Sequence, residues 1–68
     1  MKLEERIKEA GLKKSWIAKQ LDLSEPGLRL KRIGRSKWRK REIRELARIL
    51  RIEAETLSAE IGPENIKQ

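Results

Sequence analysis

The fold is decided between residues 13 and 32, which read KKSWIAKQLDLSEPGLRLKR. Ile17, Ala18 and Leu21 recur at a spacing that places them on one face of a helix, so we predict a helix over residues 13–21. Ala18 is small and lies mid-helix, where it allows a second helix to cross closely. Asp22 interrupts the apolar pattern and marks a turn.

A short helix is predicted to follow, from about Glu25 to Arg32. Ser24 suits its N-cap, and Pro26 is tolerated in the first turn, where a missing N–H costs nothing. Leu28 is expected to anchor this helix against the preceding one. Two helices joined in this way form a helix-turn-helix arrangement.

Three further helices are predicted from the same periodicity, over residues 3–10, 40–51 and 54–61. Their apolar positions are Leu3, Ile7, Ala10, Ile43, Leu46, Ala47, Leu50, Leu57 and Ile61. We therefore expect an all-α, five-helix domain over residues 1–62. Residues 63–68 are expected to form a loose C-terminal tail.

The positive charge is concentrated in the middle of the chain. The formal net charge is +7, from 18 Lys and Arg residues against 11 Asp and Glu residues. Residues 29–41 contain no acid but hold eight cations: Arg29, Lys31, Arg32, Arg35, Lys37, Arg39, Lys40 and Arg41. A cluster of this kind indicates a nucleic acid, an anionic membrane or an acidic protein as the partner.

The residue types that are missing exclude several classes of site. The sequence has no Cys and no His, so it offers no disulfide, no thiolate metal site and no histidine base. No serine has a visible base. We therefore expect no enzyme activity, no metal, no cofactor and no small-molecule ligand. No secretory signal and no apolar run of about 20 residues is present, so the expected compartment is the cytoplasm.

Residues 11–24, which read GLKKSWIAKQLDLS, resemble the lambda-repressor and Cro family of phage-type DNA-binding domains. Residues 34–38 and 42–52 resemble the approach to that family's fourth helix and the helix itself. The resemblance covers about residues 2–61. It implies a five-helix lambda-repressor-like domain, operator binding, no cofactor and frequently a symmetric dimer. Where the family often has glycine in the turn, this chain has Asp22, which tolerates a left-handed backbone better than most residues.

The resemblance also implies a set of site residues. The recognition helix would present its base-contacting residues to the major groove: Glu25, Pro26, Gly27, Arg29 and Leu30. Phosphates would be contacted by Lys14, Ser24, Lys31, Arg32, Arg35, Lys37 and Arg39. A guanidinium at Arg29 can bind guanine through two hydrogen bonds, a carboxylate at Glu25 can accept from cytosine, and Leu30 can touch a thymine methyl. The expected dimer interface is Leu57, Ile61 and Ile66, with a role in the core of a single chain as the alternative for Leu57 and Ile61.

The recognition helix departs from the expected register. An apolar residue is expected near Lys31 or Arg32, but the sequence has Leu30 and Ile33, which lie on a different side from Leu28. Either the helix is short and the chain bends before Ile33, or Leu30 is exposed for contact with DNA or a partner. The sequence leaves both alternatives open.

The two tryptophans are expected to pack rather than to bind bases. Trp16 is predicted to be partly buried, on the helix over residues 13–21 beside its apolar stripe. Trp38 is predicted to cover the core as a lid, with its indole N–H near solvent or phosphate. Stacking on single-stranded bases needs more aromatic platforms than this chain has.

The leading hypothesis is a cytoplasmic, homodimeric, sequence-specific regulator of transcription that binds double-stranded DNA. An antitoxin-like protein-interaction module with the same fold is the main alternative, with the acidic C-terminal segment as its partner surface. A basic membrane-surface or RNA-binding protein is a third.

Overall fold

The structure is a computed structural model that describes residues 2–67. Its helices are α1 (Leu3–Ala10), α2 (Lys14–Gln20), α3 (Glu25–Arg32), α4 (Lys40–Leu50) and α5 (Ala54–Ile61), followed by the 3-10 turn η1 (Pro63–Asn65). The prediction of an all-α, five-helix fold is confirmed. The predicted bounds of α1, α3 and α5 agree with the structure, those of α2 differ by one residue at each end, and those of α4 differ by one residue at its C-terminal end.

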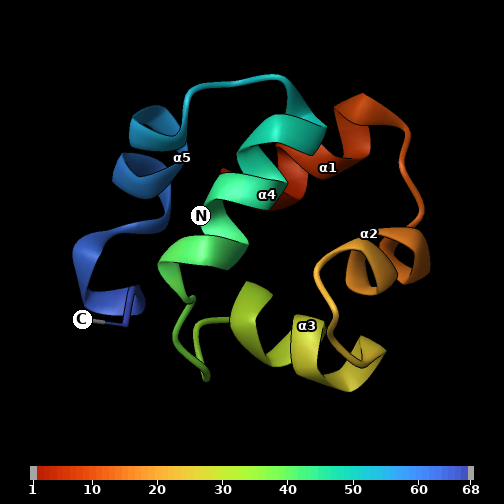
Figure 1. Ribbon diagram of the computed structural model, residues 1–68, viewed down its shortest axis with the longest axis horizontal. Helices are drawn as coiled ribbons and strands as arrows, with labels where there is room; N and C mark the ends of the chain where they lie inside the picture. The colour runs from red at the N-terminus through yellow and green to blue at the C-terminus, as the bar shows by residue number, and fades with distance from the viewer. Residues whose placement is uncertain (1, 68) are drawn as a thin grey trace.

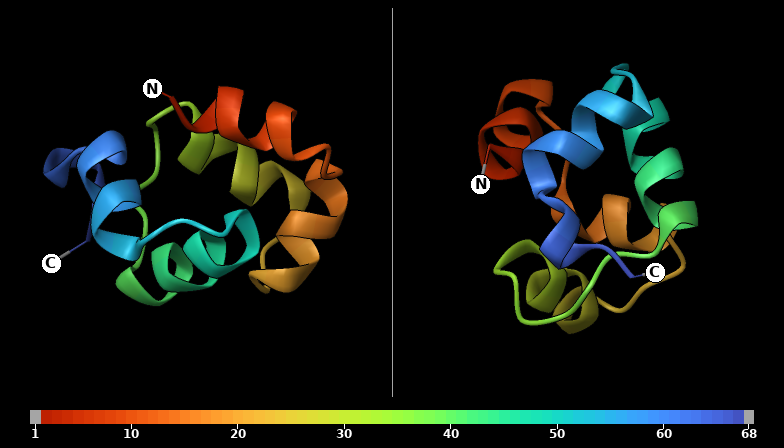
Figure 2. Two further views of the ribbon diagram at one scale, coloured as in Figure 1. Left: turned by 90° about the horizontal axis from the view of Figure 1, so that it is seen from above. Right: turned by 90° about the vertical axis from the view of Figure 1, so that its left-hand side faces the viewer.

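The helices surround one core. In Figure 1, α4 lies in front of α1, α2 and α5 lie on opposite sides of this pair, and α3 runs along the lower edge. The two views of Figure 2 confirm that α1 and α4 cover opposite faces. Helix α3 therefore has one side against the core and one side free.

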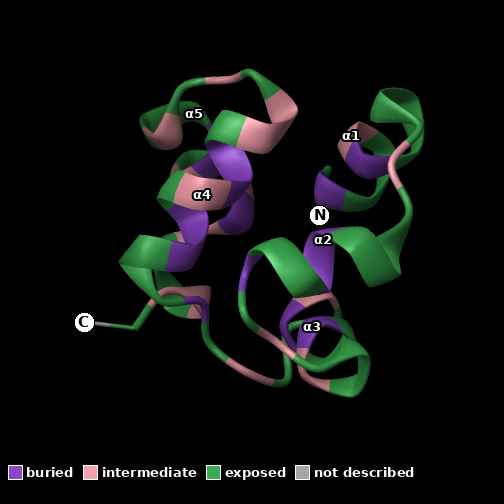
Figure 3. Ribbon diagram, turned by 45° about the vertical axis from the view of Figure 1, so that its right-hand side comes forward, coloured by how far each residue is buried: buried purple, intermediate pink, exposed green. Residues whose placement is uncertain are grey.

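The buried apolar residues come from every α-helix and from the loop before α4. They are Leu3, Ile7, Ile17, Ala18, Leu21, Leu28, Trp38, Ile43, Leu46, Ala47, Leu57 and Ile61. Figure 3 shows the buried positions on the sides of the helices that face one another. Burial of such side chains is the main force that stabilises a domain of this size.

The turn between α2 and α3 forms as the sequence predicts. Asp22 has a left-handed backbone, with a φ of 60°. The N–H of Leu23 donates to the carbonyl of Ala18 at 2.8 Å, and the N–H of Asp22 donates to that of Lys19 at 3.2 Å. These two bonds satisfy carbonyls at the end of α2 in the pattern of a Schellman motif.

The structure agrees with parts of both alternatives that the sequence left open: α3 is short and Leu30 is exposed, but the chain continues through Ile33 and turns at Gly34, whose φ is 81°. Helix α3 ends at Arg32, and Ile33 at its C-cap is half exposed. Leu30 is also exposed, at 42%. The inward position one turn after Leu28 belongs to Lys31, whose relative exposure is only 7%.

Lys31 is buried against an acidic side chain of α4. Its Nζ donates to Oε1 of Glu42 at 2.5 Å and to the carbonyl oxygen of Lys37 at 3.1 Å. The same carboxylate oxygen accepts the backbone N–H of Arg39 at 2.9 Å, which caps the start of α4. The carboxylate of Glu42 thus connects α3, α4 and the loop of residues 33–39 between them, which we call the basic loop.

The C-terminal tail packs against the domain instead of lying loose. The N–H of Trp38 donates to the carbonyl of Asn65, and the N–H of Lys67 donates to the carbonyl of Trp38, both at 2.7 Å. Ile66 pairs with Trp38 as an isolated parallel bridge. Trp38 is fully buried, so the prediction that it packs on the core is confirmed. Its indole Nε1 is also buried, without a partner among the described residues, so the prediction that this N–H lies near solvent is wrong.

The Lys31–Glu42 pair generates a stability prediction. Lys31→Ala leaves Glu42 buried without its counter-charge, so we expect the free energy of unfolding to fall by about 3 kcal/mol. Lys19→Ala, at an exposed position of α2, should change it by less than about 0.5 kcal/mol. Chemical denaturation measures both, and equal losses would contradict the assignment.

Candidate nucleic-acid interface

The outer face of α3 carries the predicted base-contacting residues. Ser24 caps the helix by accepting the N–H of Gly27 at 3.1 Å. Glu25, Pro26, Arg29 and Leu30 are exposed, and Gly27 is half buried. The cap and the buried anchors thereby fix which side of α3 faces outward.

A groove runs along this face of α3 to the start of α2. Its volume is about 460 Å³, and it is lined by Lys14, Glu25, Pro26, Leu28, Arg29, Leu30 and Arg32. Four of the five predicted base-contacting residues line it, and so do two of the predicted phosphate-contacting residues. The groove therefore brings both sets together.

The loop between α3 and α4 holds a second group of cations. Gly34 turns the chain with a φ of 81°, which favours glycine, and Arg35, Lys37 and Arg39 that follow are exposed. Within residues 2–67 none of these three side chains forms a salt bridge. Their charges are open to solvent, as a phosphate contact requires.

The prediction for Lys31 is wrong. Its ammonium group lies inside the domain against Glu42, so it cannot reach a phosphate without breaking a buried ion pair. The spacing between Leu28 and Lys31 could have revealed this burial, because residues three apart on a helix lie on the same side.

The prediction for Arg32 needs correction as well. Its side chain is 12% exposed, and its Nη1 donates to Oε1 of Glu4 in α1 at 2.6 Å. Its Nε is buried and has no hydrogen-bond partner. In this structure the guanidinium is held within the domain rather than presented as a free cation.

Lys14 is exposed, as its predicted role requires, but it also has an acidic neighbour. Its Nζ lies 3.5 Å from Oε2 of Glu4. Partial burial acts to raise the pKa of Glu4, but the hydrogen bond and charge of Arg32, with the charge of Lys14, outweigh it and lower that pKa. Glu4 thus remains ionised between two cations that line the groove. No local pattern in the sequence indicates this contact.

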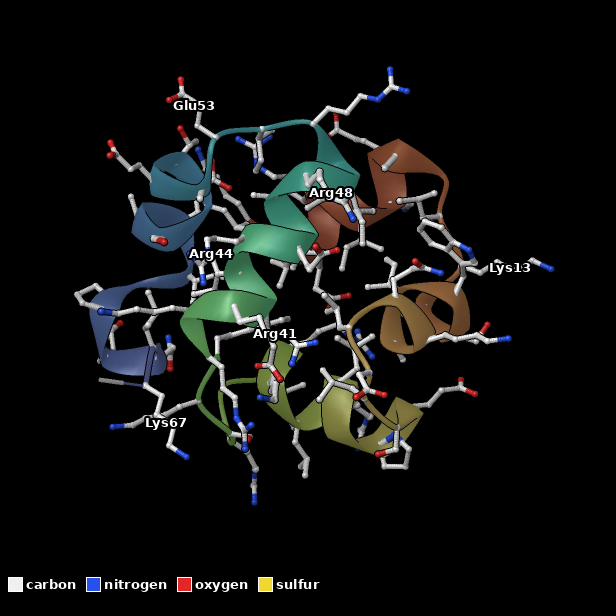
Figure 4. The ribbon with its side chains drawn as sticks, in the orientation of Figure 1. Lys13, Arg41, Arg44, Arg48, Glu53 and Lys67 are labelled. Carbon is white, nitrogen blue, oxygen red and sulfur yellow. The ribbon has the colours of Figure 1, made fainter. Side chains whose placement is uncertain are left out.

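Exposed cations continue along α4 beyond Arg41, the last residue of the basic run over residues 29–41. Arg41, Arg44 and Arg48 follow one another on its outer side in Figure 4, far from Lys13 at the start of α2. Arg48 pairs with Glu45 at 2.8 Å. The basic surface is therefore wider than the recognition helix and its loop.

The expected dimer interface is wrong in two of its three residues. Leu57 is fully buried and Ile61 is 2% exposed, so both belong to the core of a single chain. Ile66 is half buried and packs against that core beside Trp38. Of these three residues, only Ile66 retains surface for a second chain.

Trp16 is more exposed than predicted, at 43%, although most of its surface is still covered. The large apolar residues that are exposed in the described part of the chain are Trp16, Leu30 and Ile33. Trp16 is not among the residues that line the groove on α3.

Other kinds of site find little support in residues 2–67. No group of acidic side chains there is arranged to hold a metal ion. No helix in the same range combines the length and apolar character needed to cross a bilayer.

Comparisons with models of protein families, with curated proteins and with solved structures find no match to this chain.

The cap of α3 can be tested separately from any ligand. Ser24→Ala removes the acceptor for the N–H of Gly27, so we expect a loss of about 1 kcal/mol in the free energy of unfolding. Ser15→Ala, at an exposed position inside α2, is the matched control and should have little effect. Thermal unfolding compares the two, and a larger loss for Ser15→Ala would refute the cap.

Proposed function

We propose that this protein is a sequence-specific, double-stranded DNA-binding regulator of transcription, a binding protein rather than an enzyme, that acts in the cytoplasm as a repressor of the Cro type. The observation that carries the proposal is the free face of α3, where Arg29 and Leu30 line a groove and exposed cations lie on the adjacent loop. An α-helix fits the major groove of B-DNA, and a helix-turn-helix places its second helix there.

Base contacts come from the outer side of α3 in this proposal. Arg29 donates two hydrogen bonds to one guanine, Glu25 accepts from a cytosine amino group, and Leu30 contacts a thymine methyl. Pro26 and Gly27 present little side-chain bulk at the start of the helix, which lets its backbone approach the bases.

Phosphate contacts come from residues around α3. Arg35, Lys37 and Arg39 supply charge from the loop, and Lys14 supplies it from the start of α2. Ser24 has an exposed hydroxyl that accepts the N–H of Gly27, so its own hydrogen is free to donate to a phosphate. These contacts set affinity and position but carry no base information directly.

A homodimer completes the proposal. A single small module buries little surface on DNA, whereas two copies would read half-sites about 34 Å apart. Because Leu57 and Ile61 are buried, we assign the interface to a neighbouring cavity between α4, α5 and the tail. Its volume is about 530 Å³, and it is lined by Lys40, Ile43, Arg44, Ala54, Glu55, Ser58, Pro63 and Ile66.

The lining of this cavity is self-complementary in charge. A two-fold interface uses the same patch on both copies, so a residue at one edge meets the opposite edge of the partner. Arg44 of α4 and Glu55 of α5 lie on the two sides of the cavity. A two-fold arrangement pairs Arg44 of one copy with Glu55 of the other.

An antitoxin-like role is the second candidate. The cavity between α4, α5 and the tail favours this role too, because a segment of a different protein can fill it. The two candidates are separated by co-purification, because a tightly bound protein partner would favour the second.

Base recognition is tested by comparing two cations. Arg29→Ala should reduce the preference for a duplex selected from a random pool over a scrambled duplex by about tenfold, because one bidentate base contact is lost. Lys37→Gln should weaken binding to both duplexes equally and make the salt dependence shallower by about one unit of slope. Electrophoretic titration at several salt concentrations measures both. Binding of wild type without any sequence preference would refute the regulator.

The dimer interface is tested by exchanging charges. Arg44→Glu and Glu55→Arg should each weaken dimerisation by about tenfold, and the double variant should restore it. Sedimentation equilibrium measures the association, with Arg48→Glu as the control because Arg48 lies on α4 outside the cavity. A wild-type chain that stays monomeric at high concentration would contradict the homodimer.

A further inference from the structure

Glu4 connects three helices through one carboxylate. It lies in the first turn of α1, where Oε1 accepts from Arg32 at the end of α3 and Oε2 faces Lys14 at the start of α2. The side chain of Glu4 is 45% exposed. Because this carboxylate is accessible, an anion from solution can take its place beside Lys14 and Arg32.

Both cations that Glu4 holds belong to the groove on α3. Lys14 and Arg32 line it beside Arg29, so two of its three cationic side chains have an internal counter-charge. Arg29 forms no salt bridge within the described residues. The acid therefore reduces the positive charge at the place where a phosphate backbone would pass.

The ion pair of Glu4 with Lys14 contributes little to the stability of the fold, and its pair with Arg32 leaves part of the guanidinium unpaired. Lys14 is about half exposed and its 3.5 Å contact is long, and exposed pairs of this kind add little to stability. Glu4 contacts Arg32 through Nη1, while the buried Nε has no acceptor. Because that Nε is covered by the domain, a phosphate can reach it only after the Arg32 side chain has left Glu4 and moved outward, where the guanidinium can form a two-oxygen contact.

We propose that Glu4 is an internal competitor of DNA phosphate, a residue that occupies Lys14 and Arg32 until the DNA backbone displaces it. This inference rests on the proposed DNA binding. When Glu4 is displaced, the favourable contacts to phosphate are offset by the contacts it gives up. Glu4 thereby lowers the affinity for duplex DNA of any sequence, because phosphates carry no base information directly.

The test replaces the charge and keeps the shape. Glu4→Gln frees both cations, so we expect affinity at about 0.1 M salt to rise roughly tenfold, equally for a selected and a scrambled 30-bp duplex. The slope of log affinity against log salt should steepen by about 1 to 2, because up to two more phosphates are neutralised. Glu5→Gln is the matched control, since it removes the same charge from an exposed neighbour on α1 that forms no salt bridge in the described range. It should change affinity by less than about twofold.

A background variant separates displacement from simple net charge. In the Lys14→Gln background, the gain from Glu4→Gln should shrink to about threefold, because one of the two freed cations is absent. Thermal unfolding checks that each variant is folded. Glu4→Asp, which keeps the charge but shortens its reach, should give an intermediate gain and serves if Glu4→Gln does not fold.

The outcomes distinguish this proposal from the one on which it rests. If wild type binds DNA but Glu4→Gln gains no more than Glu5→Gln, or loses affinity, Glu4 is only a structural contact and DNA binding stands. An undiminished gain in the Lys14→Gln background would also overturn the competitor role. If wild type binds neither duplex, both proposals fail.

Discussion

The buried contact between Lys31 and Glu42 fixes how α3 presents its outer face, which we propose to bind DNA. An ammonium group in the interior is tolerated only where acceptors surround it, and here they are the carboxylate of Glu42 and the carbonyl of Lys37. An apolar side chain at this position could shift along the core, whereas an ion pair has one favourable arrangement. We interpret the pair as a device that sets the rotation of α3, and with it the direction of Arg29 and Leu30.

Local sequence signals predicted the helices well because those signals lie within each helix. Apolar spacing defined the faces, and Ser24, Asp22 and Gly34 marked the ends of α2 and α3. Lys31 escaped prediction because its partner is 11 residues away on another helix. Nothing in the sequence near Lys31 distinguishes it from a solvated cation except its inward register.

Helix register predicted which residues of α3 are exposed, and this part of the candidate site could therefore be predicted from the sequence. The residues placed on the outer side of α3 are accessible, and those proposed from charge alone divide into free loop cations and cations held by acids of other helices. Arg32 belongs to the second group because Glu4, 28 residues earlier in the chain, reaches it. The assignment of Leu57 to a dimer surface failed because an amphipathic helix carries one apolar stripe, and α5 uses that stripe for its own core.

The pairing of Trp38 with residues 65–67 has a consequence for the order of assembly. The loop that carries Arg35, Lys37 and Arg39 is anchored at Trp38 by the final residues of the described chain. Residues 65–67 follow all five α-helices in the sequence, so a chain made from its N-terminus forms those helices before this contact can hold the basic loop in place. Until residues 65–67 are added, the loop lacks the backbone hydrogen bonds at Trp38 that fix its position.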